Sequence, residues 1–158
     1  MTFRQKIRPS DRTAVRHIAE STGYFSGAEI EIAVELVDER LSRGADSGYH
    51  FLFMESEGDV IGFSCFGPVP ATLSSFDLYW IVVRHDFQGQ GAGRKMLAMS
   101  ESSIQGAGGR RIYAETSARD QYESTRRFYE ARGYRQAGFL PDFYAPGDGK
   151  IIYVKVID

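Results

Sequence analysis

The feature that most constrains the fold of this chain is a glycine-rich stretch that joins an apolar segment to a helix-compatible one. The stretch reads RHDFQGQGAGRK, covers residues 84–95 and carries Gly89, Gly91 and Gly93 at alternate positions. The preceding residues 78–83 are mostly aromatic and β-branched, which is typical of a strand. The pattern therefore predicts a strand, then a loop rich in glycine, then a helix.

Such a helix start can receive an anion. The first N–H groups of a helix lack partners within it and carry about half a positive charge. Glycines let a phosphate approach these groups closely, and Arg94 and Lys95 add two cations in the first turn. The stretch is not a P-loop, because Lys95 is followed by Met96 where a P-loop needs Ser or Thr. It is not a dinucleotide-binding fingerprint either, because its glycine spacing is not Gly-x-Gly-x-x-Gly. A simple flexible turn is the alternative interpretation.

The first part of the chain predicts one strand and two helices. We expect a strand at residues 2–9, and a helix at 11–21 that Ser10 caps. The sequence SGAE contains a capping box, with Ser26 as the cap and Glu29 three residues later. Gly44 is expected to end this second helix.

The remaining residues predict six strands and two helices. The order is two strands joined by the turn EGD, the strand before the glycines, a helix, a strand, a helix that starts near Asp120 and ends at Gly133, and two last strands. The predicted strands lie at 49–56, 60–69, 75–84, 110–116, 134–144 and 150–157. Hairpins mixed with strand–helix crossovers indicate an α/β (α+β) fold, with a mixed, mostly antiparallel sheet of about seven strands and four helices on both faces.

Length and composition narrow the class of protein. The 158 residues, 42% of them hydrophobic, suit a single domain over 1–158. A net charge of -2 does not favour nucleic-acid binding, and no apolar run reaches the ~20 residues of a membrane span. The single cysteine, Cys65, fits a core position in a cytoplasmic protein. The three histidines show no metal-ligand spacing, so we expect no metal.

Two motifs together resemble a known family. After the strand that ends at Val83, the residues from Gln88 to Gly93 read Gln-x-x-Gly-x-Gly, and residues 126–134 read RRFYEARGY. Both resemble markers of the GNAT superfamily of acetyl-CoA-dependent N-acetyltransferases, and the predicted element order matches that superfamily over nearly the whole chain. The resemblance implies a single N-acetyltransferase domain, that is, an acyltransferase enzyme.

The resemblance also implies where acetyl-CoA binds. In such proteins the pantetheine arm pairs with the strand before the glycines, here Ile81, Val82 and Val83. The pyrophosphate contacts carry over to Gln88, Gly89, Gln90, Gly91, Ala92, Gly93 and Arg94. Many members place an asparagine against the pantetheine arm where this chain has Tyr122. Tyr122 lies within the predicted helix, two turns from Tyr129 and on the same face, and it either stacks on the cofactor or packs against the protein.

Acyl transfer from a thioester to an amine needs a base, an oxyanion donor and an acid for the thiolate. Tyr129 is the candidate acid, because it matches the family tyrosine and a phenol with a reference pKa of ~10 holds a proton at neutral pH. Its alternative role is a core aromatic. Asp77 and Glu115 both remain candidate bases. Asp77 lies six residues before Val83, where histone-acetylating members carry a glutamate, and Glu115 ends a strand near the glutamate of ribosomal amino-terminal acetyltransferases.

The acceptor is predicted only as a class. We expect a primary amine of a small molecule, an amino acid or a peptide, which attacks directly in a ternary complex. Acidic residues of the second helix and the last loop would favour a cationic amine, although a solvated acidic face is the alternative; they are Glu29, Glu31, Glu35, Asp38, Glu39, Asp142 and Asp148. The alternative function is a non-catalytic acyl-CoA-binding sensor or regulatory module. A homodimer is also expected.

Overall fold

The computed structural model describes all 158 residues and divides them into two compact units. The first unit contains Met1–Gly67 and Trp80–Ser103, and the second contains Pro68–Tyr79 and Ile104–Asp158. Seven strands, four α-helices and three short 3₁₀ segments follow one another in the predicted order. The strands form a mixed sheet with the order β1-β2-β3-β4-β5-β7-β6, in which β4 (Ser75–Val83) contributes residues to both units. The predicted mixed sheet is confirmed, and a single domain over the whole chain stays a prediction.

Three antiparallel strands build the first unit. They are β1 (Thr2–Arg4), β2 (His50–Ser56) and β3 (Asp59–Pro68). Glu57 and Gly58 join β2 to β3 with φ of 51° and 85°, the left-handed conformation that a two-residue hairpin turn requires at both positions. The predicted EGD turn is therefore confirmed. The first strand is shorter than predicted, because its ladder with β2 ends at Arg4.

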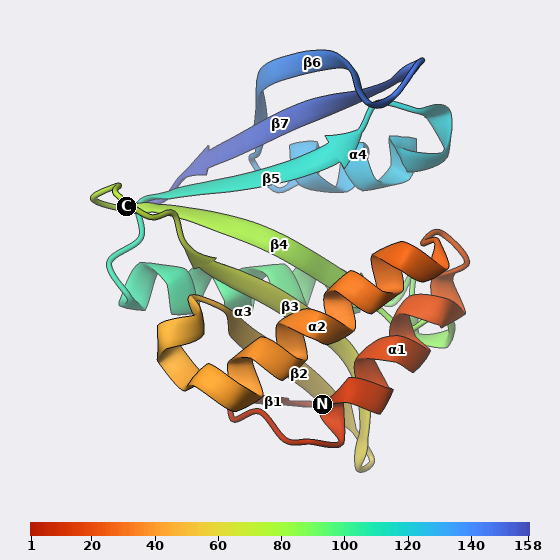
Figure 1. Cartoon of the computed structure of the whole chain (residues 1–158), viewed down its shortest axis with the longest axis vertical. Helices are drawn as coiled ribbons and strands as arrows, with labels where there is room; N and C mark the ends of the chain where they lie inside the picture. Colours follow the sequence, from red (N-terminus) through yellow and green to blue (C-terminus); the bar gives the residue numbers. More distant parts are fainter. The chain divides into compact units, whose positions relative to one another are not determined.

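Helices cover both faces of this sheet (Figure 1). The helices α1 (Asp11–Thr22) and α2 (Gly27–Arg43) pack on the face that presents Phe51 and Phe53, whereas the start of α3 (Ala92–Gly106) packs on the face that presents Met54. Neighbouring residues of a strand point to opposite faces, so β2 supplies both cores. The short η1 segment (Gly44–Ser47) follows α2 directly.

Two predicted helix caps have different outcomes. The capping box is present, since the Glu29 amide donates to Ser26 Oγ at 3.2 Å and the Ser26 amide donates to Glu29 Oε1 at 3.0 Å. Ser10 stands before α1 but its side chain makes no cap hydrogen bond, so that prediction was wrong. Asp11, the first residue of α1, accepts from residues before the helix: the Arg8 amide donates to it at 2.7 Å, and two N–H groups of the Arg4 guanidinium donate at 2.8 and 2.9 Å.

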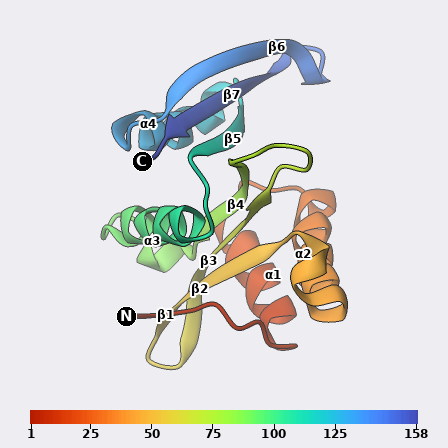
Figure 2. The same ribbon diagram turned by 90° about the vertical axis from the view of Figure 1, so that its left-hand side faces the viewer.

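The second unit has three further strands, β5 (Arg111–Ser117), β6 (Arg135–Ala145) and β7 (Asp148–Val156), and the helix α4 (Glu123–Ala131). A parallel ladder joins β4 to β5 from Ser75–Arg111 to Leu78–Ala114. β7 pairs antiparallel with both β5 and β6. Tyr129 of α4 stacks on Tyr153 of β7, so α4 covers one face of these strands (Figure 2).

Candidate active site

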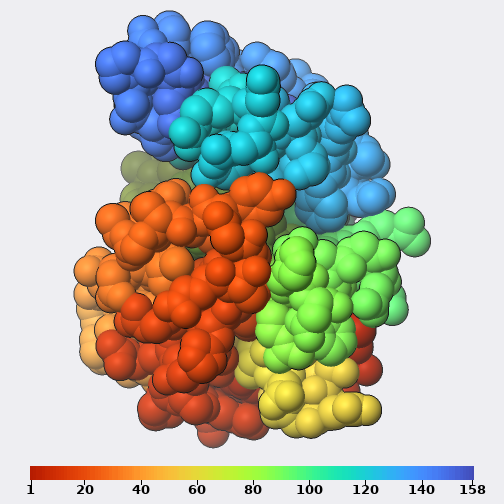
Figure 3. Space-filling model, turned by 90° about the vertical axis from the view of Figure 1, so that its right-hand side faces the viewer, coloured from red at the N-terminus to blue at the C-terminus, as the bar shows by residue number.

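The glycine stretch folds as the sequence analysis predicts, as a loop between β4 and α3. After β4 the chain makes the short η2 segment (His85–Phe87), and α3 begins at Ala92. The Gln88 side chain donates to the carbonyl oxygen of Val83 at 3.0 Å and so ties the loop back to the strand end. The His85 amide donates to Ser21 Oγ at 3.1 Å, which holds the loop beside α1 (Figure 3).

Two of the glycines adopt a conformation that other residues rarely take. Gly89 and Gly91 have φ of 78° and 82°. A Cβ added at either position would meet no atom within 4 Å, so the space in front of both is open. The first turn of α3 contains no acidic residue, and Arg94 and Lys95 are exposed there. The loop therefore has the geometry of an anion site: open backbone, a helix start and two cations.

The strand end before the loop packs firmly into the first unit. Val82 belongs to the core beneath α1 and α2, and Val83 to the core beneath α3, while Ile81 is partly buried. The Arg84 amide donates to the carbonyl oxygen of Ile61 at 2.8 Å. These contacts fix the backbone to which the pantetheine arm is expected to pair.

In the second unit, both candidate bases lie on one face of the strands. Asp77 pairs with Tyr113 across the β4–β5 ladder, and Glu115 lies two residues beyond Tyr113 on β5. Because residues paired directly across a ladder, and residues two apart on a strand, point to the same face, the two carboxylates share a face. Asp77 is one residue before the last pair of that ladder, and Glu115 is one residue after it.

A lysine that the sequence analysis did not single out joins these carboxylates. Lys150 of β7 places its Nζ 2.8 Å from Glu115 Oε2 and 4.0 Å from the centre of the Phe143 ring. Burial raises the pKa of Asp77, the charge of Glu115 raises it further, and the ammonium of Lys150 lowers it. The sequence signal for Lys150 is a lone cation that follows PGDG and precedes the apolar run IIYV.

Tyr129 lies on the opposite face of these strands, inside an aromatic cluster. Its ring is 5.2 Å from that of Tyr134, 5.7 Å from that of Phe128 and 6.0 Å from that of Tyr153. Only 5% of Tyr129 is exposed, and this burial raises the pKa of its phenol. Tyr129 is thus buried among aromatic rings and holds its proton tightly, and its role as the acid stays a prediction.

Tyr122 is not inside a helix, so that prediction was wrong. It ends the η3 segment (Asp120–Tyr122) and stands directly before α4, with φ of -100° and ψ of 8°. The guanidinium of Arg119 lies 5.7 Å from the centre of its ring. The expected common helical face of Tyr122 and Tyr129 therefore does not form.

Most of the acidic groups considered for the acceptor are already engaged within the chain. Asp38 pairs with Arg12, Glu31 with Arg16, and Glu39 with Arg43. Asp142 accepts the Gly147 amide at 2.8 Å, while Asp148 accepts from Ser117 and pairs with Arg119. These contacts favour the solvated-face interpretation over a cation-attracting surface.

Comparison with known proteins decides the family. Residues 47–136 match the model of the acetyltransferase (GNAT) domain. A solved protein from Desulfovibrio desulfuricans, assigned to the GNAT acetyltransferases, is 43% identical with a TM-score of 0.95, and the match covers 99% of each chain. The chain belongs to the GNAT acetyltransferase family. The prediction of a GNAT-type acyltransferase is thereby confirmed.

More distant solved structures share the fold of this GNAT protein. An aminoglycoside 6'-N-acetyltransferase complexed with coenzyme A is 18% identical, with a TM-score of 0.79 and coverage of 100% and 98%. The ribosomal-protein-S18-alanine N-acetyltransferase of Escherichia coli is 22% identical, with a TM-score of 0.78 and coverage of 99% and 94%. No curated protein matches the chain.

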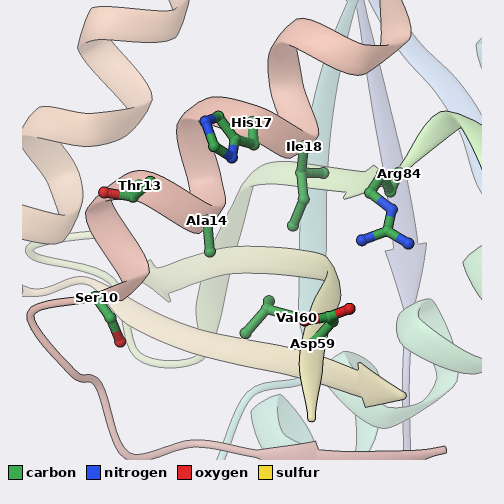
Figure 4. Close-up of a pocket in the computed structure, with 8 residues that line it drawn as sticks. All are labelled: Ser10, Thr13, Ala14, His17, Ile18, Asp59, Val60 and Arg84. Atoms are coloured by element: carbon green, nitrogen blue, oxygen red, sulfur yellow. The ribbon is translucent and has the colours of Figure 1, made fainter. Parts of the chain in front are cut away.

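Other features of this GNAT protein lie apart from the predicted site residues. A shallow hollow of about 360 Å³ in the first unit is lined by residues of α1, β3 and the strand end, among them His17, Asp59 and Arg84 (Figure 4). None of the predicted catalytic residues lines it. No group of three or more His, Cys, Asp or Glu side chains could hold a metal ion. None of the four helices is both long and apolar enough to cross a membrane.

Proposed function

We propose that this GNAT protein moves the acetyl group of acetyl-CoA to a primary amine of a small molecule, an amino acid or a peptide. The amine attacks the thioester directly, in a ternary complex, and the reaction takes place in the cytoplasm. The observation that carries the proposal is the open backbone at Gly89 and Gly91 before the start of α3.

The proposed binding of acetyl-CoA rests on that loop. A diphosphate needs several donors and little steric hindrance, and the first N–H groups of α3 supply the donors. Positions 88–94 would hold the pyrophosphate, with Arg94 and Lys95 as counter-ions. The backbone of residues 81–83 would pair with the pantetheine arm. The coenzyme A complex of the aminoglycoside acetyltransferase, which has the same fold, supports acetyl-CoA as the donor.

The assignment of the base rests on the carboxylates at the end of the β4–β5 ladder. The amine must lose a proton before its lone pair can attack the carbonyl carbon, and a carboxylate with a raised pKa is better suited to this task than an ordinary one. Asp77 has such a pKa because of burial and the nearby charge of Glu115. Both carboxylates lie at the end of the β4–β5 ladder.

The assignment of the acid rests on Tyr129. The C–S bond breaks as the tetrahedral intermediate collapses, and the thiolate then needs a proton or a hydrogen bond. Because burial raises the pKa of Tyr129, full proton transfer to a thiolate is less balanced than the reference values of ~10 and ~8.5 suggest. We therefore assign Tyr129 a hydrogen bond to the departing sulfur, which stabilises the thiolate until it is protonated.

Release of coenzyme A tests the proposed function. The purified protein is mixed with acetyl-CoA and a panel of amines that contains an aminoglycoside, amino acid amides and short peptides with a free amino terminus. Thiol release and a mass increase of one acetyl group on the acceptor are expected for at least one class of amine. A rise in Tm with acetyl-CoA, but no thiol release with any amine, would favour the sensor alternative.

A further inference from the structure

Lys150 is the cation that forms an ion pair with Glu115 in the second unit. It pairs with Ser117 across the β5–β7 ladder, and Ile152 pairs with Glu115. Because Lys150 and Ile152 are two residues apart, Lys150 points to the face that carries Glu115. Its side chain is only 12% exposed, and its Nζ lies 2.8 Å from Glu115 Oε2.

An irregular part of β6 holds the ammonium from a second direction. The pairing of β6 with β7 breaks between Leu140 and Ala145. Within this break Asp142 takes a φ of 56° and accepts the Gly147 amide at 2.8 Å. Phe143, the next residue, brings its ring to 4.0 Å from Lys150 Nζ. A cation over an aromatic ring is attracted to it and loses part of its water, so the ammonium is fixed between a carboxylate and a ring.

Charged side chains lie on this face in all three strands. Asp77 comes from β4, Glu115 and Arg111 from β5, and Lys150 and Asp148 from β7, while Tyr113 pairs with Asp77 across the β4–β5 ladder. A second carboxylate close to Asp77 disfavours its ionisation, and an ammonium favours it. Lys150 is directly paired with Glu115 alone, so the two carboxylates have different environments.

We propose that Lys150 is a positioning residue: it holds Glu115 in an ion pair and thereby leaves Asp77 as the carboxylate that accepts the proton of the acceptor amine. The inference rests on the proposed function. In the step itself, an acceptor ammonium gives one proton to the Asp77 carboxylate, directly or through a water. The ammonium becomes a neutral amine, and Asp77 becomes a carboxylic acid. Protonation of Glu115 instead would break its ion pair with Lys150, which disfavours Glu115 as the base.

Two variants should move the pH profile in opposite directions. Glu115→Gln removes the neighbouring negative charge and leaves Lys150 near Asp77, so the acidic limb of kcat/KM should move to lower pH. Lys150→Met removes the ammonium and leaves Glu115 unpaired, so this limb should move to higher pH and kcat/KM should fall several-fold below it. Lys150→Arg keeps the charge and should leave the limb close to that of the unmodified protein. If Lys150 is purely structural, both Lys150 variants should change Tm, and the acidic limb of kcat/KM should not move in either of them.

A readout without turnover separates this inference from the proposed function. Carbon-13 NMR of aspartate-labelled protein, with Asp77→Asn used to assign the signal, follows the titration of the Asp77 carboxyl itself. Its midpoint should fall in Glu115→Gln and rise in Lys150→Met, in parallel with the kinetic limbs. An Asp77 titration that moves in neither variant overturns the inference, as does activity that survives Asp77→Asn but is lost at every pH in Glu115→Gln. If no amine releases coenzyme A with the unmodified protein, the proposed function fails, while opposite shifts of the Asp77 midpoint in the two variants still support the part assigned to Lys150.

Discussion

Tyr129 is enclosed by three aromatic rings, and the predicted effect of removing its hydroxyl follows from that enclosure. Tyr129→Phe keeps the contacts with Phe128, Tyr134 and Tyr153, so the fold and the acetyl-CoA affinity should change little. Because the raised pKa keeps the phenol protonated at neutral pH, the variant loses a proton donor. We expect kcat to fall about 10²-fold, the usual range of general acid catalysis, in steady-state assays with an identified amine.

A second tyrosine of the same cluster provides the matched control. The hydroxyl of Tyr153 faces Glu130 Oε2 at 3.5 Å, so Tyr153→Phe removes a buried-cluster hydroxyl that the proposed chemistry does not use. Its kcat should stay close to that of the unmodified protein. Equal losses in both variants would mean that the cluster acts on packing and that Tyr129 supplies no proton.

Asp77 is expected to lower the stability of the protein at neutral pH. Its pKa is raised in the folded chain, mainly by burial, so the charged form is less favourable there than in the unfolded chain. The stability that this group contributes is present below its unfolded pKa of ~3.9 and is lost as the pH rises through its folded pKa. Asp77→Asn should therefore raise Tm at pH 7 and lose this advantage below about pH 4, while it lowers activity.

A carboxylate with the opposite shift is the control for this prediction. Arg16 lowers the pKa of Glu31 through a hydrogen bond, so Glu31→Gln should not raise Tm at neutral pH. Thermal melts of both variants between pH 4 and pH 8 check the sign. If Asp77→Asn melts below the unmodified protein at pH 7, its carboxylate is a structural one.

At the scale of elements, the local features could be predicted and the non-local ones could not. The capping box of Ser26 and the turn at Glu57 depend on partners within three residues, which the sequence displays. The Ser10 cap was predicted from its residue type and position, and the sequence did not show that the neighbouring Asp11 pairs with Arg4 in the folded chain. The role of Lys150 depends on the register of two strands that lie far apart in the sequence, and no local pattern encodes that register.

The start of α3 is the element on which cofactor binding depends. Gly91 has a φ of 82° and open space in front of it. Gly91→Val would place a branched side chain there, and it would also strain the backbone. We expect it to abolish the rise in Tm that acetyl-CoA produces by mass action. In the unmodified protein, a hundredfold excess of acetyl-CoA over Kd should raise the free energy of unfolding by about 2.7 kcal/mol.

Gly108→Val is the control that separates the backbone strain of Gly91→Val from its effect on acetyl-CoA binding. Gly108 has a φ of 91° with nothing within 4 Å of an added Cβ, and it follows the other end of α3. Gly108→Val should therefore lower the basal Tm to a similar extent and keep the full rise with acetyl-CoA. A full rise in Gly91→Val as well would mean that the pyrophosphate does not bind at this helix start.

For the whole molecule, the most notable surface is formed by the exposed apolar side chains of the strand β6. This strand stands at the end of the sheet order and pairs only with β7. Its large apolar side chains are about half exposed: Phe139 at 49%, Leu140 at 41%, Phe143 at 51% and Tyr144 at 49%. An edge strand with exposed apolar groups invites pairing with another chain, so β6 is where we expect two copies to associate.

Light scattering coupled to size exclusion checks this expectation. A homodimer should elute at twice the chain mass of 17.7 kDa. Leu140→Lys places a charge on the exposed face of β6 and should shift the equilibrium to the single chain. Ile32→Lys is the control, because Ile32 on α2 is 52% exposed and lies outside β6, so the dimer should persist in it. Elution of the unmodified protein at the single-chain mass at all concentrations would contradict the dimer.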